Sequence, residues 1–133
     1  MLINLRTSEA NKTVVQELTR KLFPSASENY ISRVAFSYSL SKGIKLNLEK
    51  DLADSKGKEY KDDILFGNYR DYYIALICQH YQIYKTDKDI GKYIKMHIDH
   101  GLTLMNKLFE EDRTISLGWS MALRTAELRL PHW

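Results

Sequence analysis

Apolar residues recur at helical spacing along much of the chain, and the stretch 27–43 is the most apolar of these segments. Its main face comprises Ile31, Val34, Ala35 and Tyr38, and further apolar side chains extend round a second side. Ser25 with Glu28 three residues later is typical of a capping box, and Gly43 is typical of a helix end. We therefore interpret this stretch as a central core helix that other helices or another subunit must cover.

Residues 1–6 alternate in side-chain character, which predicts a short half-buried strand. Thr7 or Ser8 is suited to cap a following helix, which ends before Pro24 because proline disfavours helix at the residue that precedes it. Strand, helix, turn and helix in this order are typical of a ribbon-helix-helix DNA-binding unit, in which two chains pair their strands. A strand this short is not stable alone, so this pattern requires a dimer.

Residues 44–67 are the least regular part of the chain and form a long connection for a compact domain. Apolar residues alternate over 44–48, which indicates a brief extended segment. Residues 55–58 indicate a turn, and 65–67 indicate a hydrophobic plug followed by a turn. Loops of this length are often functional.

Two further helices follow this connection. Asn68 is suited to cap a helix over 69–84, whose tyrosine-rich face comprises Tyr73, Leu76, Ile77, His80, Tyr81 and Tyr84. Asp87 is suited to cap a helix over 88–110. Gly91 and Gly101 interrupt that helix at a cost of about 1 kcal/mol each relative to alanine, which indicates close packing against another backbone.

The pattern as a whole predicts a mainly α fold. We expect a compact helical domain of four to five helices, with a short amino-terminal strand in a ribbon-helix-helix-like arrangement. Residues 1–112 form this single domain. Residues 113–133 are predicted to form a carboxy-terminal extension with one further helix over 115–128.

Composition adds little to the choice of function but excludes some classes. Hydrophobic residues make up 44% and charged residues 28% of the 133 residues, as in ordinary globular proteins. No apolar run is long enough for a membrane span and no signal peptide is visible, so we expect no membrane partner. Cys78 is the only cysteine, which rules out an internal disulfide and fits a reducing cytoplasm. A net charge of +3 permits nucleic-acid binding without requiring it.

Side chains that could carry chemistry are few. His97 and His100 stand one helical turn apart and His80 lies on the preceding helix, so a shared metal ion is one interpretation. No cysteine or carboxylate is placed to complete such a site, and packed or hydrogen-bonded histidines are the commoner explanation. Cys78 has no neighbouring charge that would lower its pKa, so we expect an inert, buried thiol.

Catalytic motifs are not found in the sequence. There is no phosphate-binding glycine loop, no nucleophile elbow and no nuclease-type carboxylate cluster. The acidic runs at 62–63 and 110–112 are typical of solvated turns and helix caps. We therefore expect a protein with no catalytic residues, no metal and no cofactor.

Basic side chains are better candidates for a binding site. Arg33, Lys42 and Lys45 accompany the first two helices, and Lys56 and Lys58 lie in the long connection. Such residues neutralise backbone phosphates and give salt-sensitive, sequence-independent affinity. An ordinary solvated surface is the alternative, because acidic residues lie near each cluster. We predict these five residues as a DNA-binding set.

Three blocks of the sequence resemble a known family. Residues 32–40 (SRVAFSYSL) resemble a helix of the DndE family of DNA sulfur modification proteins, and 57–60 with 65–69 (GKEY and LFGNY) resemble its central loop. Residues 97–102 (HIDHGL) resemble its helical H-x-x-H-G-L segment. The three blocks occur in the same order as in the family, and residues 113–133 lie outside the resemblance.

The resemblance implies a small helical subunit of the bacterial system that replaces a non-bridging phosphate oxygen of DNA with sulfur. It also implies a homotetramer that binds duplex DNA, preferentially nicked DNA, through surface lysines. The implied partners are the cysteine desulfurase and the other modification subunits, including an ATPase. A nicking activity is proposed for the family, but the residues of this chain give it no support.

Three other interpretations remain open from the sequence. A dimeric ribbon-helix-helix repressor would read base edges with Leu2, Asn4 and Arg6. A protein-interaction scaffold without DNA contact would use the tyrosine-rich helix over 69–84. A metal- or thiol-dependent enzyme would rely on His80, His97, His100 or Cys78.

Overall fold

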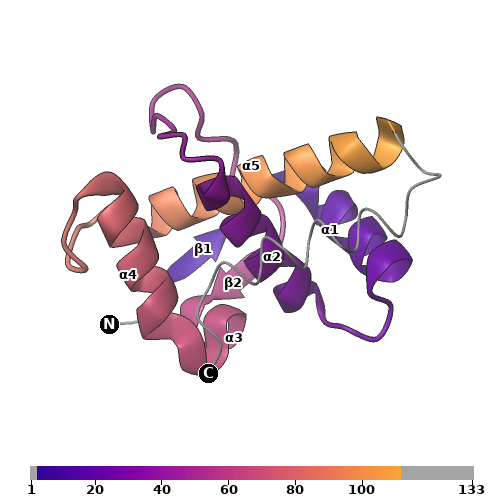
Figure 1. Ribbon diagram of the computed structural model, residues 1–133, viewed down its shortest axis with the longest axis horizontal. Helices are drawn as coiled ribbons and strands as arrows, with labels where there is room; N and C mark the ends of the chain where they lie inside the picture. Colours follow the sequence, from indigo (N-terminus) through magenta and orange to yellow (C-terminus); the bar gives the residue numbers. More distant parts are fainter. Residues whose placement is uncertain (1–2, 112–133) are drawn as a thin grey trace.

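Helices form most of the protein in the computed structural model, which describes residues 3–111 (Figure 1). The elements in chain order are β1 (Asn4–Arg6), α1 (Glu9–Leu22), α2 (Glu28–Ser41), β2 (Glu59–Lys61), α3 (Asp62–Phe66), the 3₁₀ helix η1 (Gly67–Tyr69), α4 (Arg70–Tyr81) and α5 (Ile90–Glu111). The prediction of a mainly α fold is confirmed. The helix expected over 115–128 and the extension 113–133 lie outside the described residues. No helix within 3–111 is both long and apolar enough to cross a bilayer.

The longest helix, α5, runs the length of the molecule, and α2 crosses its middle (Figure 1). At the crossing Gly101 lies against the backbone of Ala35, so closely that a methyl group on Gly101 would overlap the Ala35 carbonyl. The helix α1 packs against α2 and α5 on one side, and α4 packs against α5 at the other end. The predictions of a central core helix and of a close backbone approach at Gly101 are both confirmed.

The two strands pair within the chain. β1 and β2 are antiparallel, with Leu5 opposite Tyr60 and Arg6 opposite Glu59. Leu5 and Tyr60 are buried, whereas the Arg6 and Glu59 side chains form an exposed ion pair at 3.3 Å. The amino-terminal strand therefore pairs within its own chain, and the prediction that it pairs with the same strand of a second chain is wrong. Its partner was missed because β2 has only three residues and lies within a connection that looked irregular.

Helix ends follow local side-chain chemistry, with two corrections. The Ser8 hydroxyl accepts a hydrogen bond from the backbone of Asn11 and caps α1, as predicted. The cap of α2 is Ser27 rather than Ser25, and Ser27 accepts from the backbone of Tyr30. Tyr69 rather than Asn68 precedes α4, without a side-chain hydrogen bond. Gly43 has φ +70°, which agrees with its predicted place at the helix end.

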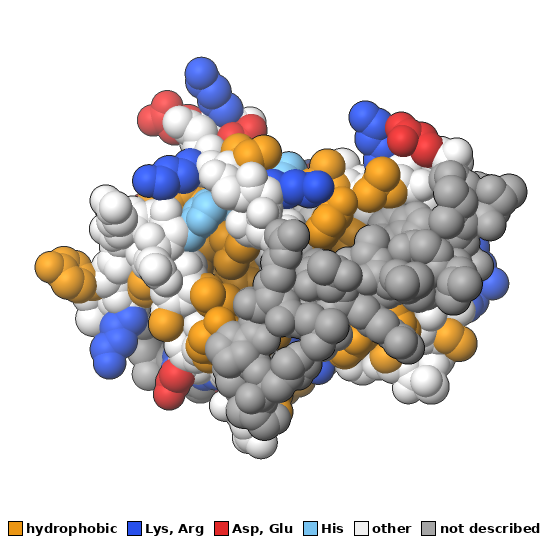
Figure 2. Space-filling view, in the orientation of Figure 1, with side chains coloured by type: hydrophobic (Ala, Val, Ile, Leu, Met, Phe, Trp, Pro, Cys, Tyr) orange, Lys and Arg blue, Asp and Glu red, His pale blue; other side chains and the backbone are white. Residues whose placement is uncertain are grey.

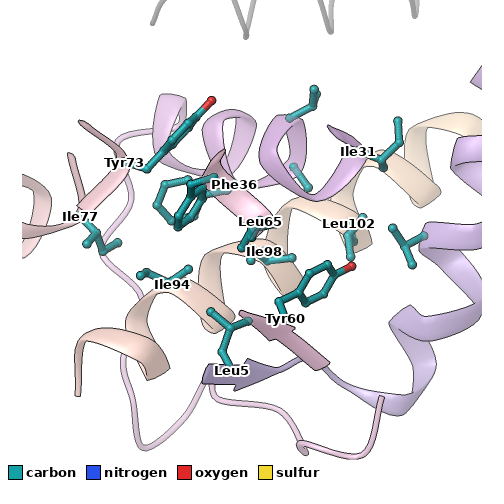
Figure 3. Packing of buried hydrophobic residues seen from close by; sticks show 14 of the residues in the cluster. Leu5, Ile31, Phe36, Tyr60, Leu65, Tyr73, Ile77, Ile94, Ile98 and Leu102 are labelled. Carbon is teal, nitrogen blue, oxygen red and sulfur yellow. The ribbon is translucent and has the colours of Figure 1, made fainter. Parts of the chain in front are cut away.

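Aromatic residues of α2, α3 and α4 contact one another in the core, and Figure 3 shows Phe36 and Tyr73 close together toward one side of it. The rings of Phe66 and Tyr73 stack with centroids 4.6 Å apart, and Phe36 lies 5.6 Å from Phe66 and 5.9 Å from Tyr73. Phe36 and Phe66 are completely buried. The tyrosine-rich face of α4 therefore contributes Tyr73 to packing, which weakens the case for that face as a docking surface.

A buried ion pair fixes the start of α1 to α5. Lys95 Nζ donates to Asp99 Oδ2 at 2.8 Å, and both side chains are less than one-tenth exposed. The other oxygen, Asp99 Oδ1, accepts from the Ser8 backbone at 3.1 Å and from Asn11 Nδ2 at 2.7 Å. Lys95 Nζ also donates to the Asp54 carbonyl at 2.7 Å. Each charge is thereby paired and hydrogen-bonded, which burial requires.

Candidate nucleic-acid interface

Three of the five predicted DNA-binding side chains are exposed on one connection. We call residues 42–56 the lysine loop: Lys42 caps the end of α2, Lys45 follows it, and Lys56 lies at the far end. Lys50, which the sequence prediction did not include, is exposed on the same loop. Among the described residues, no ion pair engages the ammonium group of any of these four lysines.

The remaining two predicted residues, Arg33 and Lys58, are less available. Lys58 Nζ donates to Glu28 Oε1 at 2.9 Å, and both side chains are about one-third exposed. Arg33 is half-buried, and its Nε atom is buried without a hydrogen-bond partner. Glu28 and Lys42 stand at opposite ends of α2, roughly 20 Å apart at the helical rise of 1.5 Å per residue. The structure therefore does not bring all five residues together.

Two of the three acidic residues of the lysine loop, Asp51 and Asp54, accept hydrogen bonds from backbone N–H groups. Asp51 Oδ2 accepts from the Asn47 backbone at 2.7 Å. Asp54 Oδ1 accepts from the backbones of Glu9 at 3.0 Å and Lys56 at 3.1 Å. The hydrogen bond from Glu9 is the main reason that the pKa of Asp54 is lowered. The backbone positions these two carboxylates, which remain negatively charged, and Glu49 is a third exposed acidic residue of the loop. The four lysine ammonium groups are exposed and make no direct ion pair within residues 3–111, so they can act as point charges toward an anion.

Positive and negative side chains lie side by side over this loop on the visible face of the molecule (Figure 2). Lys and Arg side chains project at the top of the view, where the connection after α2 rises above α5 in Figure 1, and His side chains reach the surface between them. Lys42 Nζ also lies 4.6 Å from the centroid of the Tyr38 ring, a cation–π contact that leaves the ammonium group open to an anion.

Two residues at the end of α4 hold the first part of the lysine loop. His80 Nε2 bonds to the Ile44 carbonyl at 2.8 Å, and the Leu46 backbone donates to the Tyr81 hydroxyl at 3.0 Å. Of the stretch 44–48, where a brief extended segment was predicted, residues 44–47 form no strand or helix and a turn begins at residue 48. The sequence prediction missed both anchors, because their partners are backbone groups more than thirty residues away.

A buried polar network continues from Tyr81 to α2. The Tyr81 hydroxyl lies 2.6 Å from His97 Nε2, and the Ser39 hydroxyl lies 2.7 Å from both His97 Nδ1 and His100 Nδ1. Since the Tyr81 oxygen already accepts from the Leu46 backbone, its hydrogen can be donated to His97 Nε2. His97 Nδ1–H then donates to Ser39, and the Ser39 hydroxyl donates to His100. This assignment gives each of the three hydrogen bonds one donor and one acceptor.

The charged form of His97 is strongly disfavoured in this network. Burial, followed by the nearby His80 and His100 rings, lowers the pKa of His97 to about 3. Burial is also the main cause of the lowered pKa of His100. Both rings are therefore neutral near pH 7, as the hydrogen-bond assignment requires.

Acidification is expected to destabilise the protein through His97. In the unfolded chain this histidine regains its ordinary pKa near 6.5, so between pH 6.5 and about 3 the unfolded state binds a proton that the folded state does not. The free energy of unfolding should fall by up to about 1.4 kcal/mol per pH unit below pH 6. Urea unfolding at pH 7, 6 and 5 measures this slope. His97→Gln is the control, and an equal slope in that variant would contradict the expectation.

The arrangement offers no metal site among residues 3–111, where no group of three or more His, Cys, Asp or Glu side chains is placed to bind an ion. The Nδ1 atoms of His97 and His100 converge on Ser39 instead. Cys78 is half-buried rather than buried, and its pKa is raised mainly by burial, so a thiolate is disfavoured. Hydrogen bonding and phosphate neutralisation are the chemistry that these residues support.

The family model described as DNA sulphur modification protein DndE matches residues 4–112. This chain belongs to the DndE family. The DndE fold agrees with this result: a crystal structure of DndE from Escherichia coli B7A, described as involved in DNA phosphorothioation modification, matches with a TM-score of 0.60 and 16% identity. The match covers 76% of this chain and 94% of that one. A search of curated proteins gives no match. The family resemblance inferred from the sequence is confirmed.

The three DndE-like blocks lie side by side in the fold. The first block, 32–40, lies in α2 and the third, 97–102, lies in α5, and they meet where Gly101 contacts Ala35. The second block reaches the first through the Tyr60 hydroxyl, which lies 2.6 Å from Ser32 Oγ. The residues that carry the DndE resemblance therefore build the centre of the domain, whereas the exposed lysines lie at its surface.

Proposed function

We propose that this DndE-family chain is a non-catalytic DNA-binding subunit of a bacterial DNA phosphorothioation complex. Membership of a DNA sulphur modification family supports the process, and the similar fold of the Escherichia coli protein agrees with it. The observation that carries DNA binding is the lysine loop, whose four exposed ammonium groups make no direct ion pair within residues 3–111. Since chromosomal DNA is the proposed substrate, the proposed location is the cytoplasm.

The lysine loop is suited to the DNA backbone rather than to base edges. Lysine ammonium groups on flexible stems act as point charges that neutralise phosphates without reading sequence. A nick removes the continuity of one strand and lowers the cost of bending the duplex, so more phosphates can approach the lysines of one loop. We therefore propose that nicked duplex is preferred over intact duplex.

Assembly with other subunits is also part of the proposal. We propose a homotetramer that works with the other DNA sulfur modification proteins, and this rests on the family resemblance. The sequence argument for an oligomer no longer supports it, because α5 covers the core helix and β2 pairs with the amino-terminal strand within one chain. Ile44, Ile64 and Leu108 are large apolar side chains that stay exposed and are available for contacts between subunits.

A ribbon-helix-helix repressor is disfavoured by the fold. Arg6, which would read bases in that interpretation, donates to the Gly57 carbonyl at 3.2 Å and to Glu59 Oε2 at 3.3 Å. Its strand already pairs with β2 and is short. Leu2 lies outside the described residues.

Charge reversal in the lysine loop tests the proposal. The variant with Lys42, Lys45, Lys50 and Lys56 replaced by glutamate should bind duplex DNA at least a hundredfold more weakly, because phosphate contacts dominate such affinity. The measurement is a fluorescence-anisotropy titration of intact and nicked duplexes of one sequence at two salt concentrations.

The matched control reverses exposed lysines elsewhere, Lys12, Lys85, Lys88 and Lys107, and so has the same net charge. Equal loss in both variants would show that net charge rather than the lysine loop determines binding. Failure of the wild-type protein to bind either duplex would overturn the proposed function.

A further inference from the structure

We infer, on the basis of the proposed function, that Tyr81 and His80 are positioning residues that hold the lysine loop in its DNA-binding conformation. Tyr81 does so as the outer end of the buried network that includes Ser39 and His97. Neither residue would contact DNA in this arrangement. Their effect is to fix the backbone on both sides of Lys45.

The two anchors act on backbone groups that flank one lysine. His80 Nε2 donates to the Ile44 carbonyl, and the Leu46 N–H donates to the Tyr81 hydroxyl, at 2.8 and 3.0 Å. Ile44 and Leu46 are the immediate neighbours of Lys45. Fixing both peptide groups restricts the backbone of Lys45 and therefore the direction in which its side chain leaves the surface.

The end of α4 places both anchors in one helical turn. Gln82 adopts a left-handed conformation with φ 55°, and the Ile83 backbone donates to the Cys78 carbonyl at 3.0 Å. These features end the helix immediately after Tyr81. Both side chains therefore project from a rigid element, which is the condition for holding a loop precisely.

The network connects Tyr81 to the helix that carries Lys42. From Tyr81 the hydrogen bonds pass through His97 to Ser39, which lies on α2 three residues before Lys42. Lys42 at the end of α2 and Lys45 in the loop are thus held relative to one another by the same buried groups. The loss of the Tyr81 hydroxyl would free the loop and leave His97 Nε2 without its donor.

The far end of the lysine loop has separate anchors. The Asp54 carbonyl accepts from Lys95, and its carboxylate accepts from the backbones of Glu9 and Lys56. Lys56 should therefore keep its position when Tyr81 or His80 is changed. If these residues position the loop, their replacement should remove DNA contacts from the first part of the loop only. General unfolding would remove the contacts of the whole loop.

The experiment combines hydrogen exchange with DNA titration. In Tyr81→Phe, the Leu46 amide of the free protein should exchange at least tenfold faster, with α5 amides unchanged. This variant should bind DNA about five- to twentyfold more weakly. A plot of the logarithm of the association constant against the logarithm of the salt concentration should have a slope shallower by about 1 to 2, because each lost phosphate contact removes about 0.9 from it. Tyr84→Phe is the matched control, since Tyr84 is 85% exposed.

Two variants of His80 provide a second, independent test. His80→Gln keeps an N–H donor for the Ile44 carbonyl and should bind DNA nearly as the wild type does, whereas His80→Leu should resemble Tyr81→Phe. A merely structural role would lower stability without changing the salt slope of the folded protein.

The outcomes separate the two proposals. Unchanged Leu46 exchange in Tyr81→Phe, or faster exchange with unchanged DNA affinity and salt slope, would overturn the positioning role while the wild type still binds DNA. A wild-type protein that binds neither duplex would instead overturn the proposed function, and the positioning role with it, whatever the exchange of Leu46.

Discussion

Gly101→Ala is expected to lower the free energy of unfolding by about 3 kcal/mol, at the upper end of the usual cost of overpacking. The added methyl group would overlap the Ala35 carbonyl, and both groups belong to the backbones of the two central helices. Neither backbone can move without separating α2 from α5. Urea unfolding followed by circular dichroism measures the change.

Gly91→Ala is the matched control for this substitution, because Gly91 lies in the same helix. Its added methyl group would meet the Ile3 side chain at 3.1 Å, and a side-chain methyl can shift where a carbonyl cannot. Alanine also favours helix over glycine by about 1 kcal/mol. We expect this variant to remain close to the wild type in stability. Similar stabilities of the two variants would contradict the close crossing at Gly101.

Asp99→Ala is expected to destabilise the protein by about 3–5 kcal/mol, the usual cost of leaving one partner of a buried ion pair alone. Lys95 would keep its buried charge without a carboxylate, and the Ser8 backbone and Asn11 side chain would lose their acceptor. The start of α1 should detach first. Urea unfolding and hydrogen exchange of residues 8–11 measure these effects.

A double-mutant cycle provides the control for Asp99. Lys95→Met removes the buried charge with little change in volume, so Asp99→Ala combined with Lys95→Met should lose less stability than the two single variants added together. Strict additivity, or a loss below about 1 kcal/mol in Asp99→Ala, would show that the pair is not the main link between α1 and α5.

Long, periodic segments were predictable from the sequence because their signal is local. The helices α1, α2 and α5 follow from apolar spacing, and Gly43 and Gly101 indicated a helix end and a close backbone contact. The segment 44–67 was not predictable in this way. It contains β2 and α3, which have three and five residues and are stabilised by contacts distant in sequence.

Asp62 shows why the local sequence pattern did not predict the structure of the segment 44–67. In the sequence it belongs to an acidic run typical of a solvated turn, whereas in the structure it is completely buried and accepts from Arg70 Nε at 2.6 Å. The sequence contains both residues but not their proximity. A buried carboxylate therefore resembled an exposed one until the fold brought its partner to it.

The candidate site was only partly predictable for the same reason. Lys42, Lys45 and Lys56 were found from charge and position, and the structure leaves them exposed. Lys58 was predicted on the same grounds but pairs with Glu28, thirty residues earlier. The anchors of the loop act on backbone groups, which leave no pattern in the sequence.

The covering of α2 by α5 has a consequence for the order of synthesis. The ribosome completes α2 well before it begins α5, yet α5 supplies the surface that buries Ala35. It also supplies Asp99, which accepts a hydrogen bond from the Ser8 backbone ninety-one residues earlier. The nascent chain therefore carries an apolar helix without its cover until residues 90–111 have emerged. Folding of this domain therefore waits for α5, and the apolar surface of the preceding segments must be kept from associating until α5 has emerged.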